Sequence, residues 1–300
     1  MKQVFLVILL AFGFVAGAQN ATVRKPKKQK PATEVVKSKK KASKPKDVYT
    51  KKAKVGISPT IGKANYTPNV KTFYANGVSF EMVEVRGGTF RMGATSEQGS
   101  DARGDEKPVH SVTLSGYYIG KTEVTQALWE AVMGSSPSDT TALKVDNLPV
   151  ELVSWNDCQE FIRKLNSLTG QHFRLPTEAE WEFACRGGNN SRGYKYSGSN
   201  YIDNVAWYWD NSEFSTHPVA TKLPNELGIY DMTGNVWEWC SDWYGKYSSG
   251  ALTNPKGPYD GSDRVIRGGS WGNGASCRSS FRSQASPGYR SGYLGLRLSL

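Results

Sequence analysis

Apolar and polar positions alternate in the part of the chain that follows residue 70, which is the pattern of β-strands that bury one face. The segment VSFEMVEV (78–85) begins with this alternation, and Gly87-Gly88 then interrupts it. We therefore predict a strand, a turn and a strand within residues 72–93. The segment PVHSVTLSGYYIG (108–120) also spaces apolar residues among polar ones and predicts another strand.

Three later segments carry apolar residues at helical spacing behind a residue that typically begins a helix. The first helix is predicted to begin after Thr125 and to stop at Gly134, and the second follows Ser154. The third follows Thr177, which has the T-x-x-E spacing of a capping box with Glu180. The apolar face of the second helix is expected to comprise Cys158, Phe161, Ile162 and Leu165.

Regular periodicity weakens from residue 189 onward, where Gly, Asn, Ser, Tyr and Trp dominate. Six of the nine tryptophans lie in this half, and such large rings can hold a loop-rich fold together. We expect short strands and long ordered loops here. The chain as a whole is predicted to be an α+β domain with few short helices, short strands and much irregular structure.

The N-terminus carries a targeting pattern. Lys2 precedes an apolar run from Val4 to Val15, and Ala16-Gly17-Ala18 follows, as in a cleavable signal peptide. Residues 1–18 are therefore predicted to be a signal peptide, and the mature chain to be exported to the periplasm, the cell envelope or the medium. No cysteine stands at the cleavage site, so a lipoprotein anchor is not expected.

The positive charge of the chain is concentrated behind this segment. Residues 22–54 hold 14 Lys or Arg against two acids, a net charge of +12, while the whole chain carries +11. Residues 19–70 are predicted to be a disordered Lys/Pro-rich basic linker, because they lack the large apolar residues of a core. The linker is either a solvated spacer or a contact with anionic envelope polymers or a membrane surface. A nucleic-acid partner is not expected of an exported protein. The folded domain is predicted over residues 71–300.

Familiar catalytic motifs do not account for the domain. None of the four cysteines forms a C-x-x-C pair, and the three histidines are scattered, which argues against zinc or a histidine-rich metal site. The sequence GGSWG (268–272) matches the G-x-S-x-G motif of serine hydrolases. However, no histidine follows Ser270 and no helix is expected after it, so Ser270 is not predicted to be a nucleophile.

The segment MTGNVWEWCSDWYG (232–245) places a carboxylate among tryptophans. In a strand, Trp237 and Trp239 point to one face and Glu238 to the other. A carboxylate in such surroundings needs a partner, which is either a hard cation such as Ca²⁺ or an arginine or backbone N–H group. The residues alone leave both interpretations open.

Seven segments occur in an order that resembles the formylglycine-generating enzyme (sulfatase-modifying factor) family. They are GGTFRMG, KTEVTQALWEAVMG, LPVELVSWNDCQEFIRKLN, RLPTEAEWEFACRGG, PNELGIYDMTGNVWEWCSDWYG, RVIRGGSWGNGASCRSSFRS and LGLRL, and the match runs from about residue 78 to 300. The resemblance implies a C-type-lectin-like α+β fold with much irregular structure, often with bound Ca²⁺.

The resemblance also carries expectations about individual residues. Active oxidases of the family bind Cu(I) through two cysteines in the segment after G-G-S, and that pair is missing here, so copper is not expected. The family's structural disulfide implies a bridge between Cys185 and Cys277. The family's calcium sites imply as ligands the Glu238 carboxylate and backbone carbonyls around Thr233, Gly234 and Val236, with Asn211 at a second site.

These observations favour an exported, non-catalytic binding or scaffold protein with a protein or glycan ligand. The Gly/Ser/Tyr/Arg-rich C-terminal segment has the composition of an adaptable binding face. The residues expected on that face are Trp271, Asn273, Arg278, Arg282, Tyr289, Arg290 and Tyr293. Two alternatives remain. One is a copper-dependent oxidase of sulfatase cysteines with relocated ligands, and the other is a diversified ligand-binding protein or a component of envelope or secretion machinery.

Overall fold

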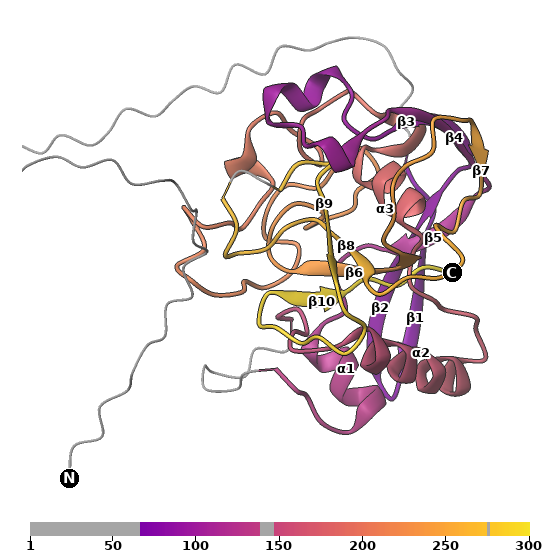
Figure 1. Ribbon diagram of the computed structural model, residues 1–300. Coiled ribbons are helices and arrows are strands. Elements are labelled where there is room, and N and C mark those ends of the chain that lie inside the picture. Colours follow the sequence, from indigo (N-terminus) through magenta and orange to yellow (C-terminus); the bar gives the residue numbers. More distant parts are fainter. Residues whose placement is uncertain (1–66, 139–146, 275–276) are drawn as a thin grey trace, which may run out of the picture. The chain divides into compact units, whose positions relative to one another are not determined.

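The computed structural model describes residues 67–138, 147–274 and 277–300 (Figure 1). The predicted signal peptide and most of the predicted basic linker therefore lie outside the described residues. Within the described ranges, no helix has both the length and the apolar character needed to cross a membrane.

The first sheet contains three antiparallel strands. β1 (Val70–Ala75) and β2 (Val78–Val85) form a hairpin, and β5 (Tyr117–Gly120) pairs with the other side of β2. Asn76 and Gly77 connect the hairpin with φ angles of 46° and 86°. Two consecutive positive φ angles are what a two-residue type I′ turn requires, and Asn-Gly is its preferred sequence.

The second sheet contains β3 (Gly88–Met92), β4 (His110–Leu114) and the short β7 (Leu252–Thr253). Two predictions for this region are wrong. The span 72–93 contributes to three strands rather than two, and the single strand expected over 108–120 is divided between β4 and β5. Ser115-Gly116 separates these two strands and sends them into different sheets, an interruption that apolar spacing alone does not reveal.

The third sheet is built from the second half of the chain, in the order β10-β6-β8-β9 (Figure 1). Its strands are β6 (Trp237–Trp243), β8 (Arg264–Arg267), β9 (Arg282–Ala285) and β10 (Leu294–Leu296). β10 runs parallel to β6, and the other pairs are antiparallel. β9 is an edge strand of this sheet, and the candidate site lies beside it.

The three predicted helices are confirmed. They are α1 (Gln126–Met133), α2 (Trp155–Thr169) and α3 (Glu178–Cys185). Thr125 caps α1 by accepting a hydrogen bond from the backbone N–H of Leu128, and Gly134 ends that helix with a φ of 88°. Thr177 and Glu180 form the expected capping box of α3. The described residues also contain four 3₁₀ turns: η1 (Ser96–Asp101), η2 (Gly104–Glu106), η3 (Gly188–Asn190) and η4 (Ile202–Asn204).

Two main clusters of buried side chains form the core. One lies between α1, α2 and the first sheet, where the rings of Trp129 and Phe161 stack with centroids 4.8 Å apart. The other surrounds α3, which contacts strands of the second and third sheets. Between α3 and β6 the chain forms only the 3₁₀ turns η3 and η4, so the expected α+β organisation with much irregular structure is confirmed.

One buried acid has a strongly perturbed ionisation. The Asp242 carboxylate lies at the start of α3, where it accepts hydrogen bonds from the backbone N–H of Glu178 (3.1 Å) and from the Ser241 hydroxyl (2.9 Å). Burial, reinforced by the nearby charge of Glu178, raises the pKa of Asp242 to about 7. Its protonation therefore changes close to neutral pH.

Candidate functional site

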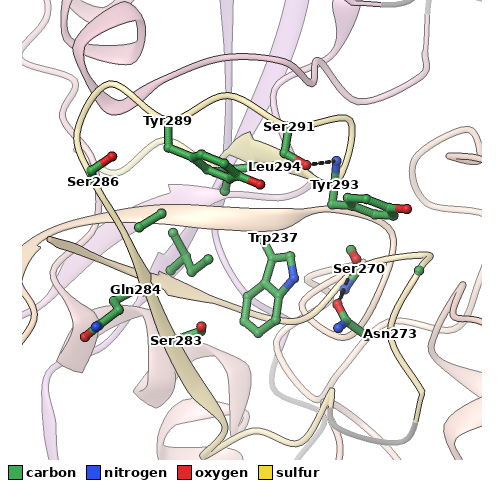
Figure 2. A pocket seen from close by; sticks show the side chains of 13 residues that line it. Trp237, Ser270, Asn273, Ser283, Gln284, Ser286, Tyr289, Ser291, Tyr293 and Leu294 are labelled. Atoms are coloured by element: carbon green, nitrogen blue, oxygen red, sulfur yellow. Dashed lines mark hydrogen bonds between the residues drawn. The ribbon is translucent and has the colours of Figure 1, made fainter. Parts of the chain in front are cut away.

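A cavity of about 540 Å³ lies beside the third sheet (Figure 2). Figure 2 shows Trp237 at the centre of its lining, with Tyr289 and Tyr293 above that indole in this view. The described residues that line the cavity are Trp237, Ile266, Ser270, Gly272, Asn273, Ser283, Gln284, Ala285, Ser286, Tyr289, Ser291, Tyr293 and Leu294. Three of the seven residues expected on a binding face are among them, namely Asn273, Tyr289 and Tyr293.

All four strands of the third sheet and two loops contribute to this lining. The pairing of β6 with β8 and of β8 with β9 places Trp237, Ile266 and Ser283 on neighbouring strands. The loops are residues 270–273, which follow β8 after a glycine pair, and residues 286–293, which connect β9 to β10. The sheet therefore supplies a rigid base, and the loops supply most of the polar groups.

The first loop is closed by hydrogen bonds between Ser270 and Asn273. The Asn273 Oδ1 atom accepts from the backbone N–H and the hydroxyl of Ser270 (2.9 and 2.8 Å), and the Asn273 N–H donates to the Ser270 carbonyl (3.0 Å). The Ser270 hydroxyl is thus bonded to an amide oxygen rather than to a base. This geometry agrees with the view that Ser270 is not a nucleophile.

Trp271 does not line the cavity but contacts Tyr293, which does. Its indole N–H donates to the Gly292 carbonyl (2.9 Å), and its ring lies 4.4 Å from that of Tyr293, centroid to centroid. A Cβ atom at position 272 would lie 2.3 Å from the Tyr293 ring, so any residue other than glycine would displace that ring. Trp271, predicted as a ligand residue, therefore holds Tyr293 in position.

The second loop is fastened to the beginning of α2. Arg290 donates to both oxygens of Asp157 at 2.7 Å, and the Ser291 carbonyl accepts from the backbone N–H of Leu152 (3.0 Å). Arg290 is on the surface, but its guanidinium is committed to this ion pair and it does not line the cavity. It fixes the loop that presents Tyr289.

The prediction that Arg278 and Arg282 belong to the binding face is wrong. Both side chains are about 2% exposed or less, and each forms a two-pronged ion pair with a buried glutamate. Arg278 binds Glu106 (2.6 and 2.8 Å), and Arg282 binds Glu178 (2.6 and 2.7 Å). Charged groups are buried only when they are paired, and these pairs connect the C-terminal strands to η2 and α3.

The described lining contains no cysteine, histidine, carboxylate, lysine or arginine. Its polar groups are hydroxyls of serine and tyrosine and amides of asparagine and glutamine, all of which can form neutral hydrogen bonds. The cavity is therefore suited to an uncharged ligand that carries both hydrogen-bond donors and acceptors and offers an apolar surface to the rings.

Comparison with known proteins identifies the domain. The sequence profile described as "Sulfatase-modifying factor enzyme 1-like domain" matches residues 69–300. The chain belongs to the sulfatase-modifying factor family. It is 34% identical to the Chaperone protein LppX of Paenibacillus barcinonensis, over 65% of this chain and 79% of that protein. It is 32% identical to the Formylglycine-generating enzyme of Streptomyces coelicolor, over 72% of this chain and 87% of that enzyme.

A solved structure confirms the fold of this family member. Treponema denticola variable protein 1 superposes with a TM-score of 0.70 at 35% sequence identity, over 78% of this chain and 99% of that one. The expected formylglycine-generating-enzyme-type fold is therefore correct. Fold and family do not decide the chemistry, which depends on the groups present at the site.

The residues of this sulfatase-modifying factor domain do not fit a copper centre at the cavity. Cys277 is the only cysteine in the segment 264–283, and burial raises its pKa to about 12. Its thiol points to the Gly274 carbonyl, with sulfur and oxygen 3.5 Å apart. Cu(I) binds to thiolates, and a buried, protonated thiol with no second cysteine in its segment does not provide such a ligand pair.

The predicted disulfide between Cys185 and Cys277 is not formed in the structure, where all four cysteines are buried free thiols. The two sulfur atoms face different groups. The Cys185 thiol donates to the Met232 carbonyl at 3.7 Å, and burial raises its pKa to about 11, while Cys277 faces Gly274.

Glu238 does not fit the calcium role that the family implies. Its two carboxylate oxygens accept three hydrogen bonds from Arg297 at 2.7–3.1 Å, and the Trp181 indole N–H donates to one of them at 2.6 Å. Glu238 and Arg297 are both completely buried, so the arginine already neutralises the carboxylate. Calcium would need oxygens that are free to bind it. The geometry agrees with the other interpretation of the sequence, in which an arginine and not a cation is the partner of this glutamate.

The other residues predicted to bind calcium have structural contacts. The Thr233 hydroxyl accepts from the Ser197 N–H (3.1 Å), the Val236 N–H donates to Glu123 (3.1 Å), and Gly234 has a φ of 82° that favours glycine. Within the described part of the chain, no group of three or more His, Cys, Asp or Glu side chains is arranged to hold a metal ion.

Asn211, the second predicted calcium position, instead organises a surface loop. Its amide donates to the Ala206 carbonyl (3.0 Å) and its Oδ1 atom accepts from the Tyr208 N–H (2.9 Å). This loop presents Trp209 and Phe214, whose side chains are 52% and 65% exposed. Trp209 was among the six tryptophans expected to hold the fold together, and no role was predicted for Phe214; the exposure of both side chains was not expected. The one sequence feature that could have identified them is the presence of two large aromatic residues within the otherwise polar segment WDNSEFS (209–215).

Proposed function

We propose that this domain is a non-catalytic binding protein that receives a neutral, polar ligand in the cavity beside β9. The observation that supports this proposal is the composition of the described lining, which lacks any group that titrates near neutral pH or binds a metal ion strongly. Hydroxyls, amides and aromatic rings recognise a ligand without reacting with it.

Export of the mature chain, with residues 19–70 as a basic linker, is part of the same proposal. It rests on the signal-peptide pattern of residues 1–18 and on the charge of residues 22–54. In this setting the domain would meet ligands of the cell envelope or of the medium, and the linker would hold it near an anionic surface.

A copper titration tests the non-catalytic part of the proposal. The purified mature chain is titrated with Cu(I) under anaerobic conditions, its thiols are counted after unfolding, and a cysteine peptide is then offered with O₂. The Formylglycine-generating enzyme of Streptomyces coelicolor serves as the positive control. We expect no stoichiometric copper, four titratable thiols and no aldehyde in the peptide. Tight binding of one Cu(I) with aldehyde formation would overturn the proposal.

A second candidate is a binding face that varies between copies of the protein. Eleven of the thirteen lining residues lie between positions 270 and 294, so one short segment could alter the ligand while leaving the rest of the fold intact. The likeness to a protein named variable protein 1 favours this candidate. Sequencing of the gene and its neighbourhood in sibling isolates tests it. Differences confined to the lining, beside a near-copy template repeat, would support it, and a uniform segment would refute it.

A further inference from the structure

We propose that the ligand of the cavity is a neutral oligosaccharide, and that Trp209 and Phe214 form a second platform that binds the sugars extending out of the cavity. This inference rests on the proposed function, because it takes the cavity as the first binding site. The platform is defined here as the exposed rings of these two residues.

The two rings of the platform are largely exposed to solvent and lie against each other. Trp209 is 52% exposed and Phe214 is 65% exposed, yet they contact each other edge to face, with centroids 5.0 Å apart and an interplanar angle of 86°. Such an arrangement lets one ring support the other while a ring face remains open to solvent. Exposed aromatic surface of this kind marks an interaction site more often than an isolated surface residue does.

The backbone adopts a strained conformation to present the platform. Glu213 and Phe214 have φ angles of 51° and 59°, and the Ser215 N–H closes the turn on the Ser212 carbonyl at 3.2 Å. Two consecutive left-handed residues are easily accommodated by Asn-Gly, as at 76–77, but not by residues with large side chains. Backbone strain that the surrounding structure maintains is typically found at functional sites.

The surrounding contacts hold this loop in one conformation. The Ser212 carbonyl is 2.8 Å from Nε2 of His217, and the His217 ring stacks on Trp207 with centroids 3.7 Å apart. The Tyr208 hydroxyl donates to Asp203 (2.8 Å), and the Asn211 side chain holds the N-terminal side of the loop through Ala206 and Tyr208. A platform that is ordered before binding loses little conformational entropy when a ligand arrives.

The loop that carries the platform is hydrogen-bonded to the cavity loop 270–273. The backbone N–H of Trp209 donates to the carbonyl of Asn273 (2.9 Å), whose side chain lines the cavity. The Ser212 hydroxyl donates to the carbonyl of Trp271 (3.0 Å), the residue that holds Tyr293. The two loops are therefore adjacent, and the proposal is that a ligand longer than the cavity extends from Asn273 toward Trp209.

The chemistry of the whole surface favours a sugar chain over other long ligands. Each sugar hydroxyl both donates and accepts hydrogen bonds, as do the serine hydroxyls and the amides of Gln284 and Asn273. The C–H faces of sugar rings match aromatic rings such as Tyr289 and Trp209. A protein partner would be expected to use arginine as well as aromatic residues, but Arg290 is bound to Asp157. The absence of charge in the described lining also disfavours anionic polymers.

Isothermal titration of the mature chain with cello-oligosaccharides and with N-acetylated chito-oligosaccharides, each of two and six sugars, tests the proposal. We expect one of the two six-sugar chains to bind about 10-fold more tightly than its two-sugar counterpart, because only the longer chain reaches the platform. Trp209→Ala should remove this gain and leave the binding of the short sugar unchanged. Tyr289→Ala, in the cavity, should weaken both. Tyr259→Ala is the control, since Tyr259 is 99% exposed and lines no described pocket.

A second variant separates loss of binding from loss of folding. Phe214→Gly accommodates the positive φ angle and should keep or raise the melting temperature while losing most of the gain for the long sugar. Equal affinities for short and long sugars, unchanged in both platform variants, would overturn the platform while leaving the cavity proposal intact. If no sugar binds to the wild-type protein, the proposal that the ligand is an oligosaccharide is wrong. The same conclusion would follow if the wild-type protein bound a protein partner and Trp209→Ala abolished that complex. The proposed non-catalytic role is judged separately by the copper titration.

Discussion

Arg297 and Glu238 are completely buried and bind each other through three hydrogen bonds, although 59 residues separate them in the sequence. The remaining donors of Arg297 reach the carbonyls of Gly120 (2.8 Å) and Tyr230 (2.9 Å). The guanidinium therefore connects β5 of the first sheet with β6 of the third. In this domain an arginine supplies the positive charge that a metal ion would otherwise bring to Glu238.

This relationship predicts a large effect of removing the carboxylate charge. Glu238→Gln leaves the Arg297 guanidinium buried without its counter-charge, so the free energy of unfolding should fall by about 3 kcal/mol. Urea denaturation monitored by tryptophan fluorescence measures the change. Glu81→Gln is the matched control, because the pair of Glu81 with Lys121 is partly exposed and should contribute about 1 kcal/mol or less. Similar losses in both variants would contradict the role of the buried pair.

Calcium should have no specific effect on the stability of the domain. A ligand that binds only the folded state raises its melting temperature, and the structure offers calcium no free carboxylate at Glu238. Melting curves of the wild-type protein in millimolar CaCl₂ and in EDTA should therefore coincide. A calcium-dependent rise that Glu238→Gln abolishes would show that Arg297 gives way to the metal ion.

The local part of this structure could be predicted from the sequence, and the long-range part could not. Thr125 and Thr177 were identified as helix caps because capping depends on residues within one turn. Arg278 was expected at the surface because its neighbours are Gly, Ser and Arg, but it is buried. Its partner, Glu106, lies 172 residues away, and only the fold brings the two together. The family resemblance predicted the fold correctly. It did not predict the partner of Glu238, because that partner, Arg297, lies outside the sequence motif that contains Glu238.

The helix cap of α3 gives a smaller, local prediction. Thr177→Ala removes the hydroxyl that accepts from the backbone N–H of Glu180 (3.2 Å). The free energy of unfolding should fall by about 1 kcal/mol. Thr177→Ser keeps the acceptor oxygen and should retain most of the stability in the same urea titration. Equal losses in the two variants would indicate that packing of the threonine methyl group, rather than capping, matters at this position.

Arg278 and Arg290, both predicted for the binding face, should differ in their effects on stability. Arg278→Met leaves the Glu106 carboxylate buried without its partner and should lower the free energy of unfolding by about 3–5 kcal/mol. Arg290→Met breaks a half-exposed pair with Asp157 and should cost about 1 kcal/mol or less. Chemical denaturation of both variants checks this ranking. The reverse order would place Arg278 at the surface, where the sequence analysis expected it.

Asp242 should make the domain less stable as the pH rises toward neutrality. Its pKa of about 7 in the folded protein lies above the value of about 3.9 expected when it is unfolded. Between these values the folded state keeps a proton that the unfolded state has lost, so the free energy of unfolding falls with rising pH. For one such group the slope reaches about 1.4 kcal/mol per pH unit, and it vanishes above about pH 8.

Asp242→Asn isolates this contribution, because asparagine cannot ionise but keeps an oxygen that can accept from the Glu178 N–H. Asp231, whose pKa is raised by burial to about 6, has an effect of the same sign and remains in both proteins. Urea titrations at pH 5, 6, 7 and 8 should therefore show the wild type losing stability relative to Asp242→Asn as the pH increases. Parallel profiles of the two proteins would mean that Asp242 ionises as readily in the folded state as in the unfolded chain.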